Sequence, residues 1–200
     1  MIFVSHRVNS STKLKKIPAL YGIEVDIRSN NGELIISHDP FARGEKFIDW
    51  IDSYNHKLLI LNVKEEGLEE KLISIMRQKS IRDYFFLDQS FPFLVKWSSL
   101  CENRSAIRVS EFEGIETALL SHKIAKWIWL DSFKEFTLSR QNYTLLKDKG
   151  FMLCLVSPEL QGRTENSDII ELHNILRKRK IAPDAICTKN ISLWKSLING

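Results

Sequence analysis

The stretch GIEVDIRSNNGELIISHDP, residues 22–40, decides the expected fold. It opens with alternating apolar and ionisable residues, in which Glu24 and Asp26 stand two positions apart. Because successive side chains of a strand point to opposite faces, both carboxylates are expected on the same face. Asn30-Asn31-Gly32 is a tight-turn signal. We therefore expect a strand that continues into a small hairpin, whose return arm carries His38.

Outward from this stretch, short apolar runs recur along the chain. Continuous runs of Val, Ile, Leu and Phe are typical of parallel strands that are buried on both faces. The segments between them place apolar residues at helical spacing, as in 67–79 and 167–180. The eight candidate strands are 2–6, 22–28, 57–64, 84–89, 105–111, 127–133, 151–157 and 184–189.

Strands that alternate with helices over the whole chain are typical of an α/β fold with a parallel sheet. We expect a compact (β/α)8 TIM barrel with the small hairpin after the second strand, formed by a single domain over residues 1–200. An open, doubly wound sheet is the alternative that this pattern leaves open.

Composition narrows the function classes. The chain of 200 residues is 44% hydrophobic and carries a formal net charge of +4. Such a mild charge favours an anionic substrate, but it is far from the dense basic patch of a nucleic-acid binder. The sequence starts on an apolar run without a basic leader, and no apolar stretch approaches the roughly 20 residues that span a bilayer. We expect a cytoplasmic protein without a membrane span or a nucleic-acid partner.

Polar residues gather where the apolar runs end. In a parallel barrel the C-terminal strand ends form the active-site mouth, so residues far apart in sequence face one pocket. His6 follows the first run, and His38 lies on the hairpin arm. Two imidazoles can activate a nucleophile and protonate a leaving alkoxide, while Arg7 and Lys64 can hold phosphate oxygens. These residue types favour phosphodiester chemistry.

Two interpretations of the carboxylate pair stand side by side. Glu24 and Asp26 share one small space, in which like charges repel or raise a pKa. A divalent hard cation such as Mg²⁺ or Ca²⁺ removes the conflict by taking both as oxygen ligands. Salt bridges to Arg7, Arg28 or Lys64 would remove it as well.

Four motifs, in order along the chain, carry a resemblance to a known family. SHR (5–7), GIEVDIR (22–28), GELIISHDP (32–40) and the strand end NVK (62–64) resemble the His-Arg, Glu-x-Asp, His-Asp and Glu-x-Lys motifs of the glycerophosphodiester phosphodiesterases, within the phospholipase-C-like phosphodiesterase barrels. The resemblance implies that His6 and His38 are the acid/base pair, that Glu24 and Asp26 are metal ligands, and that Arg7 and Lys64 contact phosphate.

The main departure from the family's pattern is Asn62, which stands where the third strand of the family offers a Glu as a metal ligand. An amide oxygen can still coordinate Mg²⁺ or Ca²⁺, but the site has one negative charge fewer. We expect weaker cation binding, unless Asp88 or Glu111 supplies a replacement.

The resulting hypothesis is a phosphoric diester hydrolase that acts on a small-molecule phosphodiester with a two-histidine acid/base mechanism and a divalent cation. Two alternatives remain. Asn62 favours either a metal-independent phospholipase-C-like lyase, or a catalytically weakened barrel that only binds phosphate or sugar. Two proton-transfer groups have no evident use in a pocket that merely binds, which argues against the second alternative.

Overall fold

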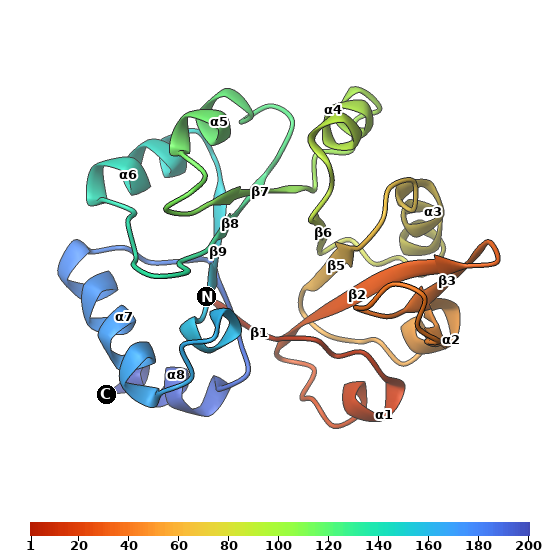
Figure 1. Cartoon of the computed structure of the whole chain (residues 1–200), viewed down its shortest axis with the longest axis horizontal. Helices are drawn as coiled ribbons and strands as arrows, with labels where there is room; N and C mark the ends of the chain where they lie inside the picture. Colours follow the sequence, from red (N-terminus) through yellow and green to blue (C-terminus); the bar gives the residue numbers. More distant parts are fainter. The chain divides into compact units, whose positions relative to one another are not determined.

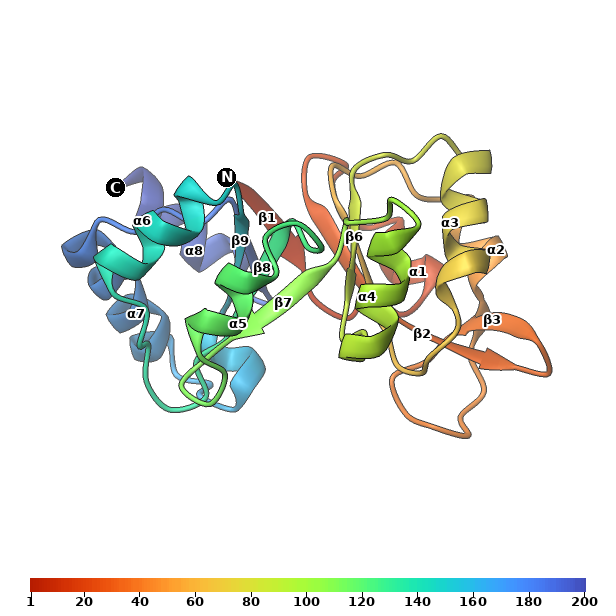
Figure 2. The same cartoon turned by 90° about the horizontal axis from the view of Figure 1, so that it is seen from above.

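The computed structural model describes every residue from Met1 to Gly200, and the chain divides into two compact units. The N-terminal unit comprises Ser5–Ser105, and the C-terminal unit comprises Met1–Val4 with Ala106–Gly200. Each unit contains helices and mainly parallel strands, as Figures 1 and 2 show, so the predicted α/β class is confirmed. The single domain and the closed (β/α)8 barrel stay predictions.

The N-terminal unit has a sheet in the order β4-β3-β2-β5-β6. Strands β2, β5 and β6 run parallel, whereas β3 pairs antiparallel with both β2 and β4. Asn31 and Gly32 link β2 to β3 with positive φ angles of 49° and 80°. The bounds are β2 Gly22–Asn30, β3 Glu33–Ile36, β4 Glu45–Lys46, β5 Leu59–Val63, β6 Tyr84–Leu87, α1 Ser11–Leu14, α2 Phe47–Ile51, α3 Glu69–Gln78 and α4 Phe91–Ser99.

The C-terminal unit has strands in the order β1-β10-β9-β8-β7. The pairs β7–β8, β8–β9 and β9–β10 are parallel. The bounds are β1 Ile2–Ser5, whose last residue belongs to the N-terminal unit, β7 Ala106–Val109, β8 Trp127–Leu130, β9 Met152–Val156, β10 Ala185–Thr188, α5 Ile115–Leu120, α6 Arg140–Asp148, the short 3-10 helix η1 Pro158–Gln161, α7 Asn166–Arg179 and α8 Ile191–Asn199.

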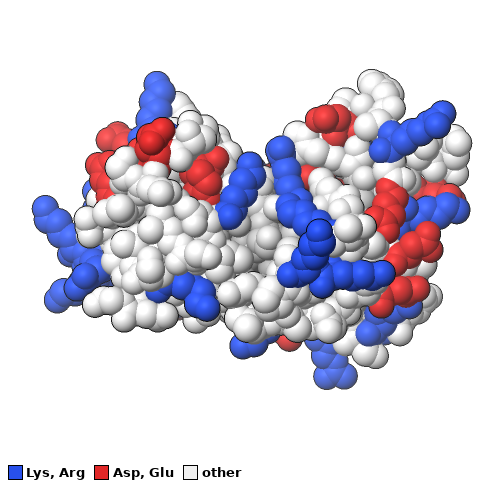
Figure 3. Space-filling model, turned by 90° about the horizontal axis from the view of Figure 1, so that it is seen from below, with Lys and Arg blue, Asp and Glu red and all other residues white.

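All eight predicted strands are present, together with the short β3 and β4. Strand β3 returns antiparallel to β2 but ends at Ile36, so His38 follows this arm and does not lie on it as predicted. None of the helices combines the length and the apolar composition that crossing a bilayer requires. On the face seen in Figure 3, basic side chains lie beside acidic ones, with uncharged surface between them.

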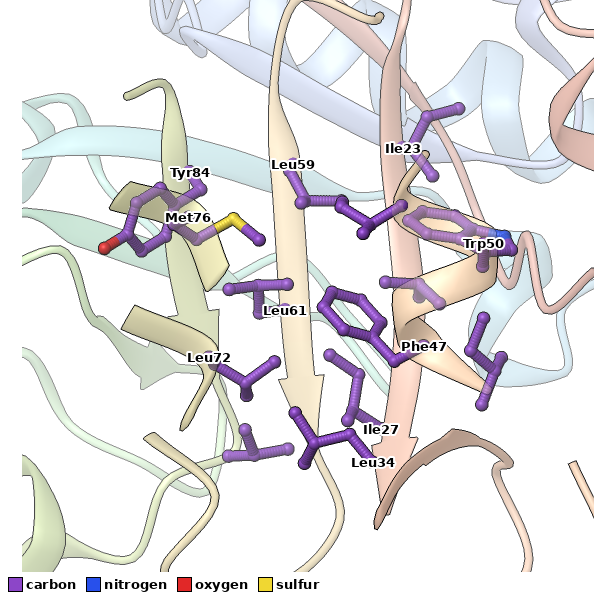
Figure 4. Packing of buried hydrophobic residues seen from close by; sticks show 14 of the residues in the cluster. Ile23, Ile27, Leu34, Phe47, Trp50, Leu59, Leu61, Leu72, Met76 and Tyr84 are labelled. Carbon is purple, nitrogen blue, oxygen red and sulfur yellow. The ribbon is translucent and has the colours of Figure 1, made fainter. Parts of the chain in front are cut away.

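The core of the N-terminal unit lies on one face of β2 and β5. Ile23, Val25 and Ile27 alternate along β2 with the ionisable residues and are fully buried. Phe47 and Trp50 of α2 pack against this face, as Figure 4 shows, with ring centroids 5.9 Å apart. Period-two alternation therefore gives β2 an apolar face toward the helices and a charged face on the other side.

Trp50 also fixes the segment that follows β1. Its indole Nε1 donates a buried hydrogen bond of 3.1 Å to the carbonyl oxygen of Val8. The Val8 N–H in turn donates to the carbonyl oxygen of Glu24 at 2.9 Å. The backbone that carries His6 and Arg7 is thus held between the core and β2.

A partly buried ion pair, Glu102 with Arg104, provides a test of the stability of the N-terminal unit. Glu102 accepts hydrogen bonds from the Arg104 Nε at 2.8 Å and from the Tyr84 hydroxyl at 3.2 Å. Burial opposes ionisation of Glu102, but the Arg104 side-chain and backbone hydrogen bonds outweigh it and lower the pKa of the carboxyl. A lowered folded-state pKa stabilises the fold above the ordinary pKa of Glu, and this stabilisation is lost as the pH falls through the folded value.

We predict that Glu102→Gln lowers the free energy of unfolding by about 1.5–3 kcal/mol at pH 7, the usual worth of a hydrogen bond to a charged group. The difference from the wild type should shrink below pH 4.5. Urea titrations at pH 7 and pH 4 measure it, with the exposed Glu171→Gln as the control. An equal loss at both pH values would contradict the role of the charge.

Candidate active site

Glu24 and Asp26 lie on the face of β2 opposite its apolar core residues, and both side chains are 0% exposed. The register aligns Asp26 with Asn62 of the parallel strand β5. Asn62 Nδ2 donates to Glu24 Oε1 at 2.9 Å, and the Arg7 backbone N–H donates to Glu24 Oε2 at 2.7 Å. Three chain segments therefore meet at one buried carboxylate.

The surroundings of Glu24 oppose its ionisation. Burial, followed by the neighbouring Asp26 carboxylate, raises the pKa of Glu24 from 4.5 to about 7, against the lowering effect of the Arg7 and Asn62 hydrogen bonds. Near neutral pH both the protonated and the ionised form of this carboxyl are therefore populated, and any added positive charge favours the ionised form.

Asp26 is held by donors on three sides. Asn9 Nδ2 donates to Asp26 Oδ2 at 2.8 Å, and the Asp26 N–H donates back to Asn9 Oδ1 at 3.1 Å. Lys64 Nζ lies 3.4 Å from Asp26 Oδ1, and Arg7 Nε lies 3.7 Å from Asp26 Oδ2. The salt-bridge interpretation of the carboxylate pair is thus realised for Asp26 by Arg7 and Lys64.

Of the two histidines, His6 lies at ion-pair distance from Glu24, and His38 is hydrogen-bonded to Arg7. His6 Nε2 is 3.8 Å from Glu24 Oε2. His38 Nε2 lies 2.6 Å from Arg7 Nη2, and His38 Nδ1 lies 2.8 Å from Asp39 Oδ1. Because a guanidinium can only donate, Nε2 of His38 is the acceptor and Nδ1 carries the proton that points to Asp39. This assigns the tautomer of His38.

All seven residues singled out in the sequence belong to this network: His6, Arg7, Glu24, Asp26, His38, Asn62 and Lys64. The two proposed replacement ligands are engaged elsewhere. Asp88 Oδ2 pairs with Lys64 Nζ at 3.0 Å. In the C-terminal unit, Glu111 accepts backbone N–H groups of residues 133–135. Neither arrangement supports a role for Asp88 or Glu111 as a cation ligand.

Sequence reasoning missed Asn9 and Asp39, although each had a signal. Asp39 directly follows His38 in the chain, and a carboxylate beside an imidazole can orient it. The hydrogen bond from His38 lowers the pKa of Asp39, so that this group stays an acceptor. Asn9 lies two residues after Arg7. Nothing in the sequence alone pairs it with Asp26.

The oxygen atoms on this face fit a hard cation. Asn62 Oδ1 is buried without a hydrogen-bond partner, and Asp26 Oδ1 accepts no hydrogen bond, with only the Lys64 ammonium at ion-pair distance. Carboxylate and amide oxygens are the ligands that Mg²⁺ and Ca²⁺ take in proteins. The chain has no group of three or more His, Cys, Asp or Glu side chains arranged to hold a metal ion. Besides the two carboxylates, the Asn62 amide oxygen is therefore the protein oxygen on this face that a cation could take as a further ligand.

We predict that Asn9→Ala lowers the free energy of unfolding by about 1–3 kcal/mol, because buried Asp26 loses one donor and its N–H loses its acceptor. Asn9→Asp should cost more, since it puts a third carboxylate against Asp26. Urea midpoints measure both effects. The exposed Asn55→Ala is the control, and equal midpoints for Asn9→Ala and this control would contradict the assigned role.

No protein-family model matches this sequence, and no curated protein matches it either. Solved structures do match. A protein of Agrobacterium tumefaciens assigned as a glycerophosphoryl diester phosphodiesterase superposes with a TM-score of 0.70 at 11% identity, over 99% of this chain and 97% of its own. A glycerophosphodiester phosphodiesterase from Agrobacterium tumefaciens gives 0.66 at 13% identity, over 98% of this chain and 99% of its own. A glycerophosphoryl diester phosphodiesterase from Parabacteroides distasonis gives 0.62 at 12% identity, over 99% and 86%. The chain therefore shares the fold of these three proteins.

Proposed function

We propose that the chain is a phosphoric diester hydrolase that acts on small-molecule phosphodiesters, as the names of the proteins with the same fold suggest. One observation carries the proposal: His38, oriented by Asp39, is hydrogen-bonded to Arg7 within the network of the two buried carboxylates. This arrangement combines a proton acceptor, a phosphate-binding cation and an acidic centre in one place.

Hydrolysis needs one group that accepts a proton and one that supplies it. Nε2 of His38 is the basic nitrogen of the assigned tautomer, and substrate phosphate would replace it as the acceptor of the Arg7 hydrogen bond. His38 then takes a proton from a water molecule while the oxygen of that water forms a bond to phosphorus. His6, beside the Glu24 carboxylate, supplies the proton to the alkoxide that leaves as the other P–O bond breaks.

Arg7 and Lys64 supply positive charge for the phosphate. Both already lie within 4 Å of Asp26, at 3.7 and 3.4 Å, so their charges are held beside the reaction centre before substrate binds. Fixed cations stabilise the negative charge that builds on the phosphate oxygens in the transition state. Asn9 is a positioning residue, because it contacts Asp26, which in turn holds Arg7 and Lys64.

We propose Glu24, Asp26 and Asn62 as the ligands of a divalent cation, Mg²⁺ or Ca²⁺. The proposal is supported by the hydrogen-bond-free oxygens of Asn62 and Asp26 and by the buried Glu24 carboxyl that Asn62 contacts, because these are oxygen ligands of the kind that hard cations take. Such a cation would supply Lewis-acid stabilisation of charge on a phosphate oxygen.

A metal-independent lyase is the second candidate, and a specific observation favours it. Arg7 and Lys64 already balance the charge of Asp26. Asn62 is an uncharged amide at the position where the resembled family has a Glu, so the site has one negative charge fewer to attract a cation. The same two histidines and Arg7 would then act on a substrate whose own hydroxyl attacks phosphorus. Turnover that is unaffected by a chelator would select this candidate, and no turnover of any diester would leave a barrel that only binds.

We predict that His6→Ala and His38→Ala each lower turnover of a phosphodiester by about a hundredfold or more, which general acid–base groups contribute. Both variants should keep their circular-dichroism spectrum, because neither side chain belongs to the apolar core. His56→Ala is the control, since its Nε2 contacts the Ile17 carbonyl away from the site. Unchanged turnover in either variant would overturn the assigned roles.

We predict that millimolar Mg²⁺ or Ca²⁺ raises the melting temperature through preferential binding to the native state. Glu24→Gln combined with Asp26→Asn should abolish the rise. Asn62→Glu should increase cation affinity in calorimetry, because charge count tunes hard-cation sites. A double variant that responds like the wild type would refute the cation site, and Asn62→Glu without a gain would remove Asn62 from it.

A further inference from the structure

A polar cavity lies in the N-terminal unit, where β5 and β6 end and α3 begins. It has a volume of about 340 Å³, and its walls include Lys64, Glu65, Glu66, Glu69 and Asp88. Lys64 connects it to the candidate active site, because the same ammonium group lies 3.4 Å from Asp26. A molecule whose phosphate contacts Lys64 can therefore extend into this cavity.

A directed chain of hydrogen bonds ends at this cavity. The hydroxyl of Ser105, which is 0% exposed, donates to Gln89 Oε1 at 2.6 Å, and Gln89 Nε2 donates to Glu69 Oε1 at 3.1 Å. A carboxylate only accepts, so the amide must present its Nε2 to Glu69, and the Ser105 hydroxyl must donate. The donors of this chain therefore all point toward Glu69, and the chain supplies a hydrogen bond to Oε1 but none to Oε2.

The acceptor that lacks a hydrogen bond is Glu69 Oε2. The Glu69 residue is 1% exposed, and this oxygen accepts no hydrogen bond. The Ser90 hydroxyl on the same wall is also buried without a hydrogen bond. A buried acceptor without a donor costs free energy, so a ligand group that donates a hydrogen bond to Glu69 Oε2 would remove this cost.

The charges of the cavity select the kind of donor. Lys64 pairs with Asp88 at 3.0 Å, and Arg28 lies 3.8 Å from Glu65. Glu66 and Glu69 have no ion-pair partner, so the cavity has an excess of negative charge. A primary ammonium group both donates hydrogen bonds and balances this charge, which a hydroxyl does not.

We propose that this cavity binds a primary ammonium group on the alcohol part of the substrate, with Glu69 Oε2 and the Ser90 hydroxyl as its acceptors. The substrate assignment rests on the proposed phosphodiesterase function. Glu69 is then a specificity-determining residue, because it binds the alcohol part of the substrate while the histidines act on the phosphate.

The test compares three 4-nitrophenyl phosphodiesters whose second alcohol is propyl, 2-aminoethyl or 2-(trimethylammonio)ethyl. The wild type should have a KM about tenfold lower for the aminoethyl diester than for the propyl diester, the usual effect of a charged hydrogen bond. The trimethylammonio diester has the charge but no donor, so its KM should stay close to that of the propyl diester. A KM as low as for aminoethyl would mean that charge alone is recognised and would overturn the role of Glu69 Oε2 as acceptor.

Glu69→Gln should raise the KM of the aminoethyl diester to the propyl level, with an unchanged KM for propyl and an unchanged kcat. Glu70→Gln removes the neighbouring exposed carboxylate of α3 and should change neither KM. If Glu69→Gln does not fold, the wild-type series alone decides: equal KM values for aminoethyl and propyl overturn the proposal, as does a variant that keeps the preference.

A separate measurement distinguishes failure of the cavity from failure of the phosphodiesterase function. If the wild type cleaves none of the diesters, the proposed function fails. Calorimetry then compares 2-aminoethyl phosphate with propyl phosphate, and about tenfold tighter binding of the amine, lost in Glu69→Gln, supports the cavity. Equal affinities overturn it.

Discussion

The burial of two neighbouring carboxylates on β2 is the constraint on which the N-terminal unit depends. A fully buried carboxylate is costly unless hydrogen bonds or opposite charges surround it. Glu24 and Asp26 obtain these from the segment after β1, through the Arg7 N–H and the Asn9 amide, and from β5, through Asn62 and Lys64. The requirements of this pair therefore draw together the residues that can perform chemistry.

The apolar face of β2 makes this arrangement rigid. Helix α2 packs its aromatic rings on that face, and Trp50 uses its indole N–H to hold the carbonyl oxygen of Val8. The residues just before and after Val8 contact the carboxylates on the opposite face. One side of the strand thus supplies the hydrophobic stabilisation that offsets the cost of the charges on the other side.

The same contacts are compatible with both proposed chemistries, and the two differ in what they require of Asn62. Its Nδ2 holds Glu24 in the present arrangement, whereas its Oδ1 has no hydrogen-bond partner. The amide can either keep the carboxylate pair closed by hydrogen bonds or offer its oxygen to a cation. A glutamate at this position would have only the second option, because a carboxylate cannot donate a hydrogen bond to Glu24.

The sequence by itself determined the α/β class, the eight strands and the face of β2 on which Glu24 and Asp26 lie, because hydrophobic periodicity is a local property of the chain. It also singled out the seven residues of the network. Only the tertiary structure decided that Asn9 holds Asp26, that Arg7 together with Asp39 sets the tautomer of His38, and that Ser105, Gln89 and Glu69 form one hydrogen-bonded chain. The Asn9 and Ser105 contacts join residues 16 or more positions apart, and the orientation of His38 also depends on Arg7, 31 positions away. Such pairings depend on how strands and loops meet in space, and periodicity carries no record of them.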